Sequence, residues 1–128
     1  MLEDNTIRAK SKSFAIRIVK MAQYLQEEKH EYVLSKQILR SGTSIGANIR
    51  ESKNAESTPD FIHKLEIALK ESDETEYWLE ILNETNYITQ TMFESMMADN
   101  NEITAMLTSI VKTTKENNKK SKTLLTQS

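Results

Sequence analysis

The residues whose types most suggest chemistry lie between positions 35 and 52, in the stretch SKQILRSGTSIGANIRES. It holds the chain's only two glycines, Gly42 and Gly46, among serine, threonine and asparagine, a composition that could form a loop around a phosphate. A P-loop needs glycines that bracket four residues and are followed by Lys-Ser or Lys-Thr. Here three residues separate the glycines and Ala47-Asn48 follows, so the P-loop interpretation fails.

The same stretch fits a helix better than a loop. Ile38, Ile45 and Ile49 recur at helical spacing and would share one face. Each glycine inside a helix costs about 1 kcal/mol relative to alanine. Close approach of another helix backbone against Gly42 and Gly46 would offset this cost. We therefore expect a helix that packs tightly against a neighbour.

Three polar residues of this helix leave a second interpretation open. Ser41, Ser44 and Asn48 could line a polar seam that fixes the register of the helices or a subunit contact. A buried asparagine has this effect in coiled coils, where it specifies register at a cost in stability.

Another side of this helix carries a basic stripe with steps of 4, 3, 4 and 3 residues: Lys36, Arg40, Thr43, Ala47 and Arg50. Arginine can hold a phosphate or a carboxylate through two parallel hydrogen bonds. The stripe could therefore contact RNA, or it could pair with Glu71 and Glu74 in the acidic third helix. With basic residues of the first helix included, the candidate nucleic-acid contacts are Arg8, Lys12, Lys36, Arg40 and Arg50.

No catalytic or metal-binding set emerges from the remaining polar residues. His63 and Glu66 are three apart, but di-metal sites in helix bundles use Glu-x-x-His twice, with glutamates from two other helices. This chain has the reverse order once, and its other histidine, His30, lies in a predicted connection. The serines of RSGTSIG have no nearby base, and the chain has no cysteine. We predict a non-enzymatic protein without a metal or cofactor.

The bulk composition indicates one soluble domain. The chain has 128 residues, of which 38% are hydrophobic and 28% charged, with a net charge of −2. One proline and two glycines argue against a sandwich or barrel with many tight turns. No apolar run approaches the roughly 20 residues that span a bilayer. The first ten residues, MLEDNTIRAK, lack the apolar core of a signal peptide, so a cytoplasmic location without membrane contact is expected.

The charge is segregated along the chain. The first helical region is basic, and the third is acidic and has one lysine, Lys70, among its carboxylates. A second basic cluster lies near the C-terminus and comprises Lys112, Lys115, Lys119, Lys120 and Lys122. Such segregation permits an anionic partner on one surface, although charged faces are usually only solvated.

Apolar periodicity and end signals predict four helices. The first should begin near Asp4 or Asn5, and the third after Thr58 as N-cap with Pro59 in the first helical position. Thr91 with Glu94 forms a capping box for the fourth. Short connections place successive helices antiparallel, so the expected fold is an all-α, up-down four-helix bundle over residues 1–116. Residues 117–128 lack periodicity and are expected to form a flexible tail.

Two large aromatic residues, Tyr77 and Trp78, interrupt the acidic third helix. They are either core or helix-packing residues, or one of them belongs to a subunit interface, where aromatic side chains are enriched.

The stretches QILRSGTSIGANIRES and DFIHKLEIALKESDETEYWLEIL resemble the four-helix bundle family of 23S rRNA intervening-sequence proteins. This family also includes the accessory variability determinant of bacterial diversity-generating retroelements. The resemblance covers about residues 5–112, and the second and third helices carry its specificity. The matching positions are Gln37, Arg40, Ser41, Ser44, Ile45, Asn48, Glu51, Phe61, Lys64, Ala68, Lys70, Glu71, Glu74, Tyr77, Trp78 and Leu79.

The resemblance implies an all-helical protomer that assembles as a homopentameric barrel. Intervening-sequence members are encoded within insertions in bacterial 23S rRNA genes, and the retroelement member binds nucleic acid and a reverse transcriptase through a strongly basic surface. This chain differs from that member in its net charge of −2 and its acidic third helix.

The resemblance also points to a polar network or interface between the second and third helices: Arg40, Ser41, Ser44, Asn48, Glu51, Lys70, Glu71, Glu74, Tyr77 and Trp78. A partly buried Arg40 in such a network predicts a loss of about 2 kcal/mol or more for Glu71→Ala. Two functions follow from the sequence. One is an oligomeric bundle that binds structured RNA through the first and second helices. The other is a protein-binding scaffold or accessory subunit, for example of a reverse transcriptase, that does not itself bind RNA.

Overall fold

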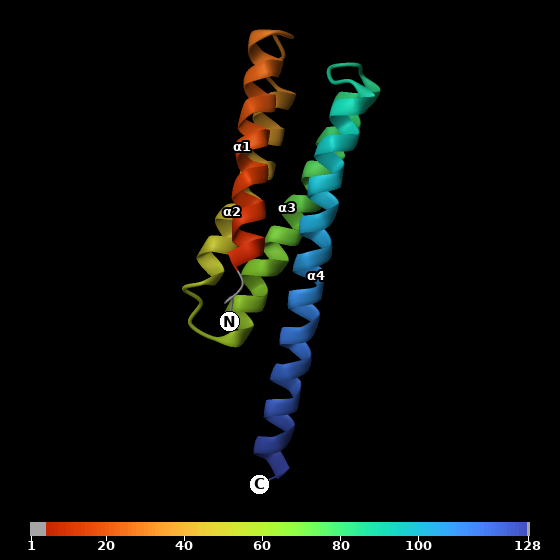
Figure 1. The fold of residues 1–128 in the computed structure, drawn as a ribbon. Helices are drawn as coiled ribbons and strands as arrows, with labels where there is room; N and C mark the ends of the chain where they lie inside the picture. The colour runs from red at the N-terminus through yellow and green to blue at the C-terminus, as the bar shows by residue number, and fades with distance from the viewer. Residues whose placement is uncertain (1–4, 128) are drawn as a thin grey trace.

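The computed structural model describes residues 5–127, which form four α-helices and no strand within that range (Figure 1). The helices are α1 (Asn5–Glu27), α2 (Leu34–Ser52), α3 (Thr58–Glu84) and α4 (Gln90–Gln127). The stretch around the two glycines is thus helical, as its isoleucine spacing predicts. α2 ends at Ser52, the last residue of that stretch.

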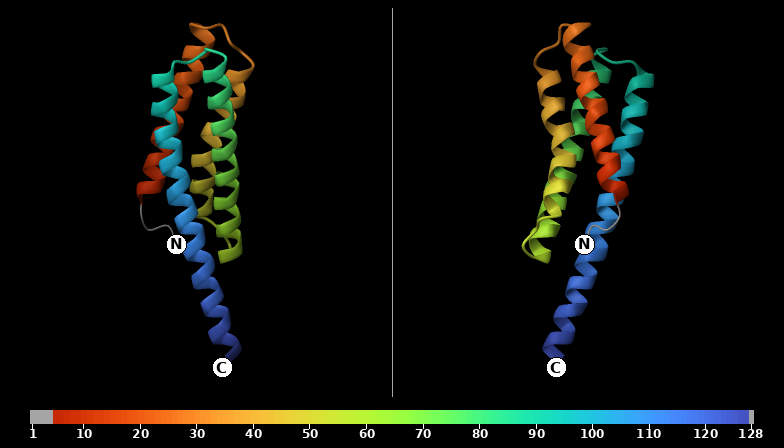
Figure 2. Two further views of the ribbon diagram at one scale, coloured as in Figure 1. Left: turned by 90° about the vertical axis from the view of Figure 1, so that its right-hand side faces the viewer. Right: turned by 60° about the vertical axis from the view of Figure 1, so that its left-hand side comes forward.

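The four helices form an up-down antiparallel bundle, which confirms the predicted fold of the protomer. α1 and α3 run in one direction and α2 and α4 in the other, as the views in Figure 2 show. Helices adjacent in sequence pack along one another, whereas α1 and α4 contact each other more sparsely. Two ion pairs, Lys10–Glu102 and Arg17–Asp99, link α1 to α4.

The core consists of the predicted apolar stripes. In α1, the buried residues of the stripe are Ile7, Phe14, Ile18, Met21 and Leu25. In α3 they are Phe61, Leu65, Ala68, Leu79 and Leu82, and in α4 they are Met96, Ile103, Leu107 and Val111. Full burial of one such Leu, Ile or Phe side chain contributes about 1.5–3 kcal/mol, so this core is the main source of stability.

Two predicted caps are wrong by one or two residues. Ser57, and not Thr58, caps α3, because its backbone is extended and its Oγ accepts a hydrogen bond from the Asp60 N–H at 3.1 Å. At α4 the Thr89 Oγ1 accepts from the Met92 N–H at 3.1 Å, so the helix begins before Thr91. The first candidate cap of α1, Asp4, lies outside the described residues.

α4 is longer than its neighbours and continues past the end of the bundle (Figures 1 and 2). Residues 117–127 are helical, which differs from the aperiodic tail expected from the sequence. Among the α4 side chains described, which end at Leu124, Val111 is the last buried one, and each side chain from Lys119 to Leu124 is exposed. Lysine and leucine are good helix formers, and extending an existing helix avoids the cost of nucleation.

Candidate functional site

The small residues of α2 allow α1 to pack closely against it. A Cβ placed on Gly42 would lie 2.7 Å from Cγ1 of Ile18, and one on Gly46 would lie 3.3 Å from the carbonyl oxygen of Ser11. The expected close approach of a helix backbone is therefore confirmed at Gly46. At Gly42 the neighbour is instead a branched side chain. Both glycines serve the same interface, between α1 and α2.

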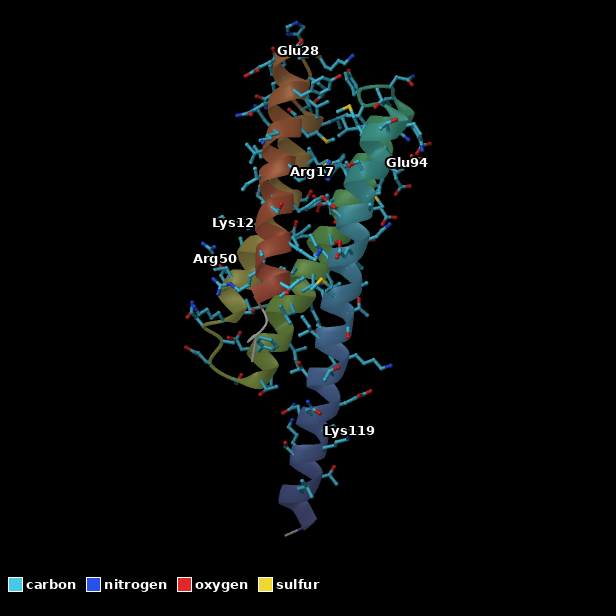
Figure 3. The ribbon with its side chains drawn as sticks, in the orientation of Figure 1. Lys12, Arg17, Glu28, Arg50, Glu94 and Lys119 are labelled. Carbon is cyan, nitrogen blue, oxygen red and sulfur yellow. The ribbon has the colours of Figure 1, made fainter. Side chains whose placement is uncertain are left out.

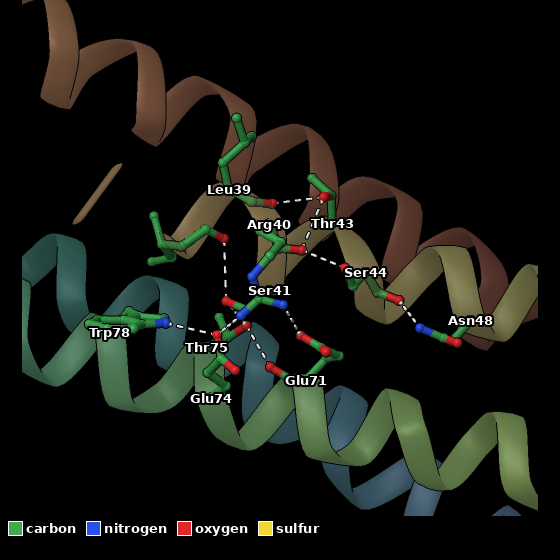
Figure 4. Close-up of polar contacts among 11 residues, drawn as sticks. Leu39, Arg40, Ser41, Thr43, Ser44, Asn48, Glu71, Glu74, Thr75 and Trp78 are labelled. Atoms are coloured by element: carbon green, nitrogen blue, oxygen red, sulfur yellow. Dashed lines mark hydrogen bonds and ion pairs between the residues drawn. The ribbon is translucent and has the colours of Figure 1, made fainter. Parts of the chain in front are cut away.

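The opposite side of α2 meets α3 through one buried polar contact. The Thr75 hydroxyl lies 3.0 Å from Ser41 Oγ and 2.8 Å from the carbonyl oxygen of Glu71 (Figure 4). Ser44 and Asn48 do not extend this contact, because both bond within α2. Ser44 Oγ donates to the Arg40 carbonyl at 2.6 Å, and Asn48 Nδ2 donates to the Ser44 carbonyl at 2.8 Å.

Arg40 also points toward α3, where carboxylates hold its guanidinium. Its Nη1 lies 3.2 Å from Glu71 Oε2, and its Nη2 contacts Glu74 (Figure 4). The indole N–H of Trp78 donates to the same Glu74 carboxylate at 3.0 Å. The Arg40 side chain is 50% exposed, so this charge cluster lies at the surface of the bundle. Arg40 is therefore already neutralised by its neighbours.

The other members of the predicted network lie apart from this cluster. Glu51 pairs with Lys64 at 3.5 Å, and Lys70 is exposed without a hydrogen bond or ion pair to any other described residue. Trp78 is partly buried against the core, with its ring 5.1 Å from that of Tyr77 in an edge contact. Tyr77 is 55% exposed and so remains available to a partner.

A surface cleft of about 280 Å³ lies between α1 and α2. We call it the α1–α2 cleft, and its lining residues are Arg8, Ser11, Lys12, Ala15, Thr43, Gly46, Ala47 and Arg50. Gly46 lets the two helices approach closely at the floor of the cleft, and the short side chains of Ala15 and Ala47 leave its mouth open. Lys12 and Arg50 project on the same side of the molecule (Figure 3). The basic stripe of α2 is thus divided, with Arg40 facing α3 and Arg50 facing α1.

The α1–α2 cleft is cationic, and no acidic residue in the described part of the chain pairs with its cations. None of its lining residues is acidic, and Arg8, Lys12 and Arg50 form no ion pair with any residue in the described range. Arg8 Nε is buried and has no hydrogen-bond partner there. The other cations of α1 behave differently, since Lys10 and Arg17 pair with carboxylates of α4. Three of the five candidate nucleic-acid contacts therefore meet in one place.

Lys36 lies outside the α1–α2 cleft. It is exposed in the first turn of α2, 14 residues before Arg50, which corresponds to about 21 Å along the helix axis. Ser11, Ala15 and Gly46 line the cleft but were not predicted to do so. Their small size was the available signal, combined with the i, i+4 spacing of Arg8 and Lys12.

The described residues contain no group of three or more His, Cys, Asp or Glu side chains arranged to hold a metal ion. Within the same range, none of the helices combines the length and apolarity needed to cross a membrane. Over residues 5–127 the chain is an all-helical bundle with a cationic cleft on its surface.

Comparison with known proteins identifies the family. A family model described as 23S rRNA-intervening sequence protein matches residues 3–109, so the chain belongs to this family, as the resemblance predicted. It is also similar to a protein of unknown function from the S23 ribosomal protein family of Bacteroides thetaiotaomicron, known from a crystal structure. The two share 57% identity with a TM-score of 0.82 over 83% of this chain and 98% of that chain. No curated protein matches.

Proposed function

We propose that the protein is a non-enzymatic, oligomeric bundle that binds structured RNA through the α1–α2 cleft. The proposal rests on one observation: Arg8, Lys12 and Arg50 line the same cleft, and no lining residue carries a carboxylate. Protein binding to nucleic acid depends largely on lysine and arginine contacts to phosphates. Arg40 is left out of the proposed surface because Glu71 and Glu74 hold its guanidinium.

Family membership supports the same ligand class. The family is described by its association with 23S rRNA intervening sequences, and the related crystal structure comes from the S23 ribosomal protein family. Neither description says what the proteins bind. The family thus suggests RNA as the ligand, and the cleft suggests where RNA would bind. A ligand of this kind suits a cytoplasmic protein.

The oligomer is proposed from the resemblance, which implies a homopentamer. Exposed apolar side chains support a further buried surface, because Ile16, Val19 and Tyr77 are 48%, 38% and 55% exposed. Light scattering on the peak that elutes from a size-exclusion column should give a molar mass of about five times the 14.8 kDa mass of the chain. A mass of one chain would contradict the proposal.

Salt-dependent binding tests the RNA proposal. A fluorescent rRNA hairpin and a single-stranded control of equal length would be titrated with the protein over a series of salt concentrations. Because cations that contact phosphates release counterions, affinity for the hairpin should fall steeply as salt rises. Arg50→Gln should weaken binding about tenfold and reduce the salt slope by about one.

A matched variant separates the cleft from general positive charge. Arg17→Gln removes the same charge from a residue that pairs with Asp99 and faces α4. It should weaken RNA binding much less than Arg50→Gln. Equal loss in the two variants, or no binding at low salt, would contradict RNA binding at the α1–α2 cleft.

A protein-binding scaffold or accessory subunit is the second proposal. It is favoured by the outer face of α3, where Asp73, Glu80 and Glu84 are exposed and form no ion pair with another described residue. A basic protein partner, such as a reverse transcriptase, would suit that surface. Charge reversal by Asp73→Lys and Glu80→Lys should abolish binding of such a partner and leave RNA binding intact or stronger.

A further inference from the structure

We propose that the α1–α2 cleft binds a single phosphomonoester group, held by Arg8, Lys12 and Arg50. The inference rests on the proposed function and sharpens it, since it assigns the cleft to a terminal phosphate and not to the sugar-phosphate backbone in general. Two sources share this chemistry. One is the 5′-phosphate end of an RNA, and the other is the phosphate of a free nucleotide.

Charge favours a phosphomonoester over other anions. A phosphomonoester carries about −1.5 to −2 charges at neutral pH, whereas a backbone phosphodiester or a carboxylate carries one. Three side-chain cations line the cleft, and no lining residue opposes them. A bound dianion would therefore neutralise the three cations more fully than a bound monoanion would. Like charges one helical turn apart, as at Arg8 and Lys12, repel each other, so a bound dianion would also relieve an existing cost.

Hydrogen-bonding capacity gives the same indication. Arg8 Nε is buried yet donates to no residue of the described chain, and a buried donor without a partner costs about 1–3 kcal/mol. A phosphate oxygen could accept this bond once the partly buried Arg8 side chain turns toward the cleft. The forked guanidinium groups of Arg8 and Arg50 come from different helices, and each can bind phosphate through paired donors. The Thr43 hydroxyl is already bonded to the Leu39 carbonyl at 2.7 Å, so it is not counted as a donor.

Space is available because small residues form part of the lining. Gly46 lets the two backbones approach closely, since a Cβ there would lie 3.3 Å from the Ser11 carbonyl oxygen. The open volume therefore comes from the short side chains of Ala15 and Ala47. Ala47 also lines the cleft, and its side chain is exposed. Ala47→Leu should therefore cover the cleft while it preserves the three cations and the helix, because leucine is a good helix former. This substitution therefore tests whether binding requires a pocket of defined shape or only a surface of high positive charge.

The test compares one RNA hairpin with and without a 5′-phosphate, at fixed salt. The phosphorylated hairpin should bind about tenfold more tightly, the difference expected for a hydrogen-bonded charge pair. Arg8→Gln and Ala47→Leu should remove this preference, and Arg17→Gln should retain it. Adenosine monophosphate, compared with adenosine, should compete for the cleft and raise the melting temperature of the wild type but not of Arg8→Gln. Unfolding curves of each variant check that the bundle is intact.

The outcomes distinguish the two proposals. Equal, salt-dependent binding of both hairpins would overturn the phosphomonoester pocket and leave the RNA function standing. Stabilisation by adenosine monophosphate, lost in Arg8→Gln and accompanied by no RNA binding, would support the pocket with a free nucleotide as its ligand and overturn the RNA function. If neither hairpin binds and adenosine monophosphate does not stabilise the protein, both proposals are overturned.

Discussion

The two sides of α2 are built in opposite ways. Toward α3 the helix presents Arg40 and Ser41, and each finds a partner on the facing helix. Toward α1 it presents glycines and then Arg50, whose charge has no counterpart among the described residues. The first side is complete within the protomer. The second joins tight packing to a charge that pairs with no described residue, so it leaves a cation free to meet an anion.

Gly42→Ala should have the largest effect on stability. Its Cβ would lie 2.7 Å from Ile18 Cγ1, and overpacking of this kind costs about 1–3 kcal/mol, more than the roughly 1 kcal/mol that alanine gains in helix propensity. Urea unfolding should therefore show a lower midpoint. In an Ile18→Ala background the same substitution should be neutral or stabilising. A higher midpoint in the wild-type background would show that the two helices are not closely packed there.

Thr75→Val tests the opposite side of α2 and should cost about 1 kcal/mol. It removes the hydroxyl that lies 3.0 Å from Ser41 Oγ while it keeps shape and β-branching. Thr108→Val is a suitable control, because Thr108 is exposed on α4 and its side chain makes no polar contact with another described residue. It should change the free energy of unfolding by less than about 0.5 kcal/mol. Equal effects of both substitutions would contradict a stabilising contact between α2 and α3.

Glu71→Ala should cost about 0.5–1 kcal/mol, less than the 2 kcal/mol expected from the sequence. The reason for the lower value is that Arg40 is half-exposed and keeps Glu74 as a second partner. A double-mutant cycle with Arg40→Ala, measured by chemical denaturation, would isolate the pair. A coupling energy of 2 kcal/mol or more would mean that the pair is shielded from water, as in an oligomer interface.

Arg50→Gln should have the smallest effect on stability, within about 0.5 kcal/mol of the wild type. Its charge is not paired within the described chain, so nothing structural is lost. Thermal unfolding checks this expectation. A clear fall in the melting temperature would indicate that Arg50 has a structural role and would weaken its assignment to a ligand.

Periodicity was sufficient to predict the core and the helical segments that contribute to it, because burial requires apolar residues at fixed helical steps. It did not predict the exposed helical residues 117–127 of α4. Helix ends were harder, since neighbouring residues compete for the same cap. Ser57 and Thr58 can both accept a backbone hydrogen bond, and only the backbone conformation at Ser57 decides between them. No cap was predicted for the start of α2, at Leu34. Glu31 Oε1 accepts from the Ser35 N–H at 2.8 Å, and no sequence signal distinguishes it from the glutamates nearby.

The site was predicted in part. The spacing in α2 indicated one basic stripe, but spacing along a single helix does not say which neighbour each residue faces. Arg40 and Arg50 therefore looked equivalent, although one meets α3 and the other meets α1. A polar contact between α3 and α4 was missed altogether. There Ser72 Oγ donates to Asn100 Oδ1 at 2.9 Å, and pairing across helices of this kind depends on tertiary packing.

The length of α4 has a consequence for local stability. Its 38 residues begin inside the bundle and end beyond it, so the free energy needed to open a backbone hydrogen bond should not be uniform along the helix. Amides near Ile103 and Leu107 should exchange with deuterium only when the whole bundle unfolds, because these side chains are buried in the core. Protection should fall steadily after Val111. A hydrogen–deuterium exchange profile of α4 would thus locate the residue beyond which packing in the bundle no longer stabilises the helix.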